Sequence, residues 1–143
     1  MKKMIIIAAG LALLLAGCGQ SPSENEKLAR AYLEGMGYEI VSFERESAVS
    51  FTEEKLHQLP GELIWAVQYV EPDEYVNKEL ATVNFMITNH PLDDQYGMGQ
   101  TNATVLVYDG QAFGGWSFPH SKEPLDGGFY SIDGKTAEEV RGD

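Results

Sequence analysis

The sequence predicts an α+β domain: one N-terminal helix packed on a mainly antiparallel meander sheet of about five to seven strands, with a short inserted helix. Near the start, apolar residues recur at helical spacing and form one stripe: Leu28, Ala29, Tyr32, Leu33 and Met36. Further along, 81–88 alternates apolar and polar residues, and the neighbouring β-rich segments are joined by short turns. The helical stripe and one sheet face each need a cover, so we expect them to pack together.

The N-terminal segment has the order of a signal peptide. Lys2 and Lys3 precede an apolar run over 4–15, and the run ends in Leu15-Ala16-Gly17-Cys18. The run is shorter than the about 20 residues of a stable membrane-spanning helix, which favours a cleaved signal over a permanent anchor. The tetrapeptide resembles the lipobox of bacterial lipoproteins. An ordinary secretory signal that happens to contain a cysteine is the alternative.

The lipobox resemblance implies where the protein lies. Cys18 would receive a diacylglycerol thioether, carrying fatty acids such as palmitate, and would become the new N-terminus. Two acyl chains suffice for stable anchoring. The expected location is the cell membrane, lipid-anchored on its extracytoplasmic face. Gly19 does not resemble an inner-membrane retention signal, so the outer membrane is expected in a cell with two membranes. Residues 1–17 are then the signal peptide, 18–25 a flexible tether and 26–143 a single domain.

Composition narrows the range of partners. The formal net charge of −12 argues against nucleic acid, whose phosphates would be repelled, and against lying flat on anionic lipid. Cys18 is the only cysteine, so no internal disulfide can form. Stability must come from packing and hydrogen bonds in one core.

The first predicted element is a helix over 24–36. Ser23 and Glu26 match a capping box at its start, Glu26 and Arg30 are spaced as an ion pair, and Gly35 and Gly37 indicate its end.

The next segment is predicted from short β-rich and helical patterns. Residues 38–43 and 48–51 suggest a hairpin, and Thr52 is a plausible N-cap for a short helix over 53–59 that stops at Pro60-Gly61. The strongly apolar run 63–70 suggests a central strand.

The last third predicts most of the sheet. Strands are expected at 81–88, 103–108, 112–118 and 128–132. Asp109-Gly110 indicates a hairpin turn, and Gly114-Gly115 suggests a bulge. Thr136 and Glu139 match a second capping box, which opens a terminal helical turn.

One loop, 89–102, carries candidate ligands for a divalent cation. His90, Asp93 and Asp94 could converge there, with His120 supplying a further ligand, or His90 could act as a general base. The simpler interpretation, which we favour, is a polar turn rich in Asn, Pro and Asp whose histidine can be removed at little cost in stability. No complete metal-binding or catalytic motif is present, so no metal, cofactor or catalytic residue is predicted.

Aromatic residues gather late in the chain: Phe113, Trp116, Phe118, Phe129 and Tyr130. They are expected to contribute mainly to the core. If some face outward, Trp116 above all, they would form a platform for a sugar, a peptide or a partner protein.

Two stretches, 65–93 and 131–140, resemble small uncharacterised extracytoplasmic lipoproteins of Gram-positive bacteria, a resemblance that implies no activity. The sequence favours a non-catalytic, membrane-tethered binding or accessory module over an enzyme. A divalent-cation-binding protein or metal-dependent enzyme using 89–102, and a structural component of an envelope complex, are the alternatives. The membrane, through the lipid on Cys18, is the expected partner, together with an envelope protein or a cell-wall component.

Overall fold

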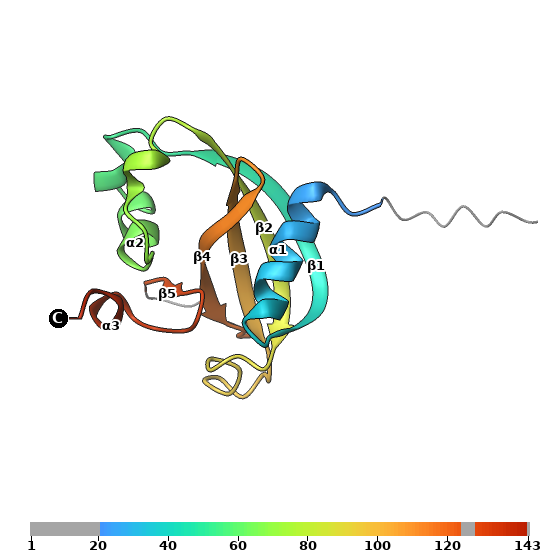
Figure 1. Ribbon diagram of the computed structural model, residues 1–143. Coiled ribbons are helices and arrows are strands. Elements are labelled where there is room, and N and C mark those ends of the chain that lie inside the picture. The colour runs from blue at the N-terminus through green and yellow to red at the C-terminus, as the bar shows by residue number, and fades with distance from the viewer. Residues whose placement is uncertain (1–20, 124–127, 143) are drawn as a thin grey trace, which may run out of the picture.

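A computed structural model describes residues 21–123 and 128–142. In this part of the chain, five strands form one antiparallel sheet in the order β1-β2-β3-β4-β5, and helix α1 packs on one of its faces (Figure 1). The predicted α+β class is therefore confirmed. The elements are α1 (Glu24–Gly35), β1 (Glu39–Ser50), η1 (Lys55–His57), α2 (Gly61–Ala66), η2 (Pro72–Glu74), β2 (Glu79–Thr88), β3 (Thr101–Tyr108), β4 (Gln111–Pro119), β5 (Tyr130–Ser131) and α3 (Ala137–Arg141).

Helix α1 begins and packs largely as its sequence predicts. The Ser23 hydroxyl accepts a hydrogen bond from the Glu26 amide at 3.0 Å, which confirms the N-cap. The Glu26 carboxylate pairs with Arg30 at 3.1 Å instead of returning to the Ser23 amide, so only half of the predicted capping box forms. The buried side of α1 lies over a core of Val83, Phe85, Ile87, Ala103, Val105 and Val107, with Ala29 and Leu33 fully buried against it.

Strand β1 corrects the predicted hairpin at 38–51. It is one continuous strand with two register shifts against β2, between Ile40 and Ser42 and between Phe43 and Arg45. No turn residue interrupts this segment. Its charged middle is compatible with a strand because β1 is the outermost strand of the sheet, where charged side chains remain in water.

The apolar run 63–70 is also corrected: it begins in helix α2 and is not a central strand. A short apolar run has the same appearance in a buried helix and a buried strand. Here Ile64 packs with Leu80 and Leu106 on the sheet face opposite α1. The predicted helix 53–59 is only a 3-10 turn, although the Thr52 hydroxyl does accept from the Lys55 amide at 3.2 Å.

The C-terminal predictions largely hold. Asp109 and Gly110 have positive φ angles of 48° and 75° and join β3 to β4, as a two-residue hairpin requires. The bulge lies one residue before the predicted position: Leu106 pairs with Gly114 while Val107 pairs with Ala112, so Phe113 is the extra residue, and Gly114 and Gly115 pair in regular register. β5 is shorter than expected, and the capping box at the start of α3 is complete.

Candidate functional site

His90, the central residue of the cation hypothesis, is buried and makes two hydrogen bonds. Its exposure is 5%. Nδ1 accepts from the Leu92 amide at 3.1 Å, which leaves the proton on Nε2 to be donated to the Ile132 carbonyl at 2.8 Å. The ring also contacts Tyr38, with centroids 4.8 Å apart. One ring nitrogen therefore fixes the turn within the β2–β3 loop, and the other links this loop to the segment after β5. His90 is thus not a surface residue, which removes the basis of the expectation that it can be replaced at little cost in stability.

The other loop candidates do not join His90 around a common point. Asp93 organises the loop: its carboxylate accepts from the His90 amide at 3.1 Å and from the Thr101 hydroxyl at 2.8 Å. Asp94 is exposed, and His120 borders a separate depression lined by the end of β4, the residues that follow it and Asn102. Among the described residues, no group of three or more His, Cys, Asp or Glu side chains is arranged to hold a metal ion.

The burial of His90 predicts a pH-dependent stability. Burial lowers the pKa of His90 below 6.5, and this outweighs the opposing effects of the Ile132 carbonyl and of the charges on Asp93 and Asp133. Below about pH 6.5, the His90 imidazole binds a proton more readily in the unfolded chain than in the folded chain. The free energy of unfolding should therefore fall as the pH drops from 7.5 to 5.

Denaturant unfolding at several pH values measures this effect. His90→Gln should lower the free energy of unfolding by about 1 to 3 kcal/mol at pH 7.5, because it leaves the Leu92 amide and the Ile132 carbonyl without their partner. It should also make the free energy of unfolding depend less steeply on pH. His57 is exposed, so His57→Gln should keep the wild-type slope. Equal slopes in all three proteins would contradict the role assigned to His90.

The more promising site is a hollow on the sheet face opposite α1. Helix α2 and its aromatic neighbours cover one end of this face, around Leu80 and Leu106. The other end is open and holds a cavity of 420 Å³. The residues that line it come from β1, β2, β3, β4 and the approach to β5: Arg45, Ser47, Thr82, Asn84, Asn102, Thr104, Trp116, Phe118 and Phe129.

The strand register aligns the centre of this hollow. Arg45 on β1 pairs with Asn84 on β2, Asn84 pairs with Thr104 on β3, and Thr104 pairs with Trp116 on β4. Directly paired residues project from the same face of a sheet. The four side chains therefore form one row across the strands, with a cation at one end and an indole at the other.

Amide and hydroxyl groups make up the floor of the hollow. The Asn84 side-chain nitrogen donates to Asn102 Oδ1 at 2.6 Å and to the Thr104 hydroxyl at 2.8 Å. Among the described residues, Asn84 Oδ1 and the Asn102 side-chain nitrogen make no hydrogen bond to protein. The floor is thus pre-ordered by its internal bonds and retains one acceptor and one donor for a ligand.

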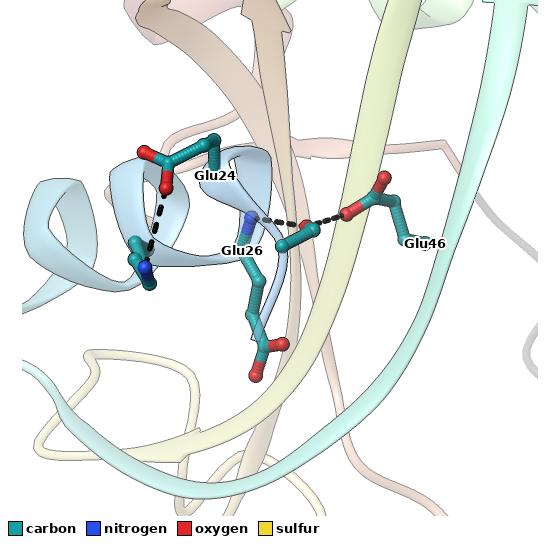
Figure 2. A network of polar contacts seen from close by, with 5 residues as sticks. Glu24, Glu26 and Glu46 are labelled. Carbon is teal, nitrogen blue, oxygen red and sulfur yellow. Dashed lines mark hydrogen bonds and ion pairs between the residues drawn. The ribbon is translucent and has the colours of Figure 1, made fainter. Parts of the chain in front are cut away.

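Within 21–123 and 128–142, no carboxylate lines the hollow, although the chain is strongly acidic. Arg45 is its one charged lining residue and makes no ion pair within 21–123 and 128–142. The two glutamates beside it bond elsewhere. Glu44 accepts from the Ser42 hydroxyl, and Glu46 accepts from the Ser23 hydroxyl at the start of α1, as Figure 2 shows. The positive charge of Arg45 is therefore available to an anionic group.

An aromatic wall bounds the β4 side. Trp116 and Phe118 each contact Phe129, with ring centroids 5.7 and 4.7 Å apart, and all three side chains are half-buried. The aromatic residues that the sequence assigns mainly to the core thus divide between two roles. Phe113 stacks on Tyr75 beneath α2 at 3.9 Å. Trp116 packs against the core cluster around Leu80 and Leu106, as expected, and also lines the hollow together with Phe118.

Gln68 secures β4 next to this wall. Its side chain donates to the Gly115 carbonyl at 2.7 Å and accepts from the Gly115 amide at 2.9 Å. β5 pairs with Trp116 and Ser117 of β4. At Gly115, the residue before them, the Gln68 amide takes the place of a strand partner. This contact fixes the backbone that immediately precedes Trp116.

The sequence analysis does not single out four of the residues that line the hollow: Arg45, Asn84, Asn102 and Thr104. The available signal was the polar side of the β2 alternation, at Thr82 and Asn84, but its alignment with Trp116 depends on the register of three strand pairs.

Within the described residues, no helix has both the length and the apolar character needed to cross a membrane. No family model, no curated protein and no solved structure matches the chain.

Proposed function

We propose that the chain is a lipid-anchored extracytoplasmic lipoprotein that acts as a non-catalytic binding module. The hollow on the open sheet face is its ligand site. The observation that carries this proposal is the row from Arg45 to Trp116. Here an arginine that has no ion pair within 21–123 and 128–142, a pre-ordered amide floor and a half-buried indole share one concave surface. Concave sites with aromatic walls and a few fixed polar groups are typical of small-ligand binding.

The anchoring half of the proposal is supported by the lipobox resemblance at 15–18. Cys18→Ala removes the thiol that would take the lipid. We expect the variant to incorporate no labelled palmitate and to retain its uncleaved signal when expressed in a bacterium. Equal labelling of wild type and variant would contradict the lipoprotein assignment.

The binding half is tested by ligand-induced thermal stabilisation of the full chain in a zwitterionic detergent. The probes are small saccharides, short peptides, and zinc, manganese and calcium ions. A ligand that binds only the folded state raises Tm. We expect at least one saccharide or peptide to raise the Tm of the wild type, and Trp116→Ala to lose that increase.

Tyr96→Ala is the matched aromatic control, because Tyr96 is 50% exposed and lies outside the hollow. It should keep the wild-type response. A Tm increase that survives Trp116→Ala would place the site elsewhere. Micromolar cation binding lost in His90→Ala or Asp93→Ala would instead support the cation-binding alternative.

A further inference from the structure

We propose that the hollow binds a short acidic saccharide, with a pyranose ring against Trp116 and a carboxylate at Arg45. This inference rests on the proposed binding function and adds the chemical class of the ligand. It follows from four properties of the lining: the separation of aromatic and polar groups, the kinds of polar atom present, the charge, and the length of the row.

The aromatic and polar groups lie on opposite sides of the hollow. Trp116 and Phe118 are two residues apart on β4, so their side chains leave the same face about 7 Å apart. The amides and hydroxyls lie on β1, β2 and β3. A suitable ligand therefore has an apolar face and a polar edge. A pyranose ring has both, since its C–H groups form a flat apolar face and its hydroxyls project from the rim.

The polar atoms match hydroxyl groups in particular. A sugar hydroxyl both donates and accepts, and the floor offers both functions at adjacent positions. Asn84 Oδ1 can accept, the Asn102 side-chain nitrogen can donate, and the hydroxyls of Ser47 and Thr82 can do either. Because Asn84 is already held by Asn102 and Thr104, its side chain has little conformational freedom left to lose on binding.

Charge selects among the ligands that have this shape. Because the described lining residues include one arginine and no carboxylate, an anionic group is favoured over an amine. A polyphosphate ligand is disfavoured, because a single cation would face several negative charges in a chain of net charge −12. One carboxylate matches a single guanidinium in charge and can pair with it through two parallel hydrogen bonds.

The length of the row favours more than one ring. Arg45 and Trp116 are separated by three strand spacings, or about 14 Å. One six-membered ring stacked on the indole does not reach that far, whereas a disaccharide does. An extended peptide is the weaker candidate, since peptides that use sheets usually pair with an exposed edge and this hollow lies on a face.

The test compares two disaccharides that differ by one lactyl ether group, which carries a carboxylate. The probes are the β-1,4-linked disaccharide of N-acetylglucosamine and its counterpart in which one ring is N-acetylmuramic acid. The full chain is labelled with nitrogen-15 in a detergent that carries no sugar headgroup, because such a headgroup would compete. The two indole N–H signals, from Trp65 and Trp116, are followed by NMR and assigned with Trp116→Phe.

We expect saturable movement of the Trp116 signal, with the acidic disaccharide binding at least threefold more tightly than the neutral one. Trp116→Ala should weaken binding at least tenfold, as followed by the Asn102 side-chain signals. Arg45→Gln should bring the two disaccharides to equal affinity, whereas Arg141→Gln, the same change of charge on α3, should leave the preference intact.

Three outcomes would overturn the inference: no saturable response to either disaccharide, equal affinity for both in the wild type, or a preference that persists in Arg45→Gln. Arg45 is exposed, so its variant tests the carboxylate contact even if Trp116→Ala does not fold. A short uncharged peptide is titrated in parallel. If the peptide shifts the Trp116 signal and neither saccharide does, the ligand class fails while the proposed binding function stands.

Discussion

Gly115→Ala is expected to destabilise the protein by about 2 to 6 kcal/mol, as the sum of overpacking and backbone strain of about 1 to 3 kcal/mol each. A Cβ atom at this position would lie 2.0 Å from the Thr104 carbonyl oxygen and 3.1 Å from Val105 Cα, both on the paired strand β3. The φ angle of +155° is one that side-chain-bearing residues rarely adopt. Relief would require β3 and β4 to separate beneath Trp116.

Denaturant unfolding of the full chain gives the difference in free energy. Gly35→Ala is the control. Gly35 ends α1, has an ordinary φ and has no atom within 4 Å of its added methyl group. That variant should be neutral or slightly more stable. A Gly115→Ala protein within 0.5 kcal/mol of the wild type would contradict the close approach of β3 and β4.

Gln68→Leu is expected to cost about 2 to 4 kcal/mol, because each buried polar group left without a partner costs about 1 to 3 kcal/mol. Leucine keeps much of the side-chain volume but removes both hydrogen bonds to Gly115 and the bond to the Ile64 carbonyl at 2.8 Å. Gln68 is only 8% exposed, so water cannot readily replace these bonds.

Gln58→Leu is the matched control for this change. Gln58 is exposed, and in the described part of the chain its side chain bonds only the nearby Glu54 carboxylate. Replacing this side chain should therefore change stability by less than about 0.5 kcal/mol. Similar unfolding free energies for the two variants would mean that the Gln68 side chain does not support β4.

The elements that sequence reasoning predicted well carry their signal locally. The alternation over 81–88, the Asp109-Gly110 turn and the Thr136 cap each depend on residues a few positions apart. The segments at 39–50 and 61–66 were misassigned because their states depend on distant parts of the chain. β1 is continuous because β2 pairs along its whole length, and α2 is helical over a sheet face that the local sequence does not reveal.

The candidate site was harder to predict for the same reason. Trp116 could be singled out by residue type alone. Its alignment with Arg45 requires the correct register across three strand pairs, two of which contain irregularities, and a slip of one residue moves a side chain to the other face. The role of His90 was hard to predict for the same reason, since it depends on the Ile132 carbonyl 42 residues away.

A map of amide chemical-shift changes across the whole domain, measured on adding the acidic disaccharide, tests the central claim most directly. The account predicts that the largest changes fall on Arg45, Thr82, Asn84, Asn102, Thr104 and Trp116, which meet only through the fold. It predicts small changes in the 89–100 loop and in the aromatic cluster beneath α2. Changes centred on either of those regions, with the open sheet face unaffected, would contradict it.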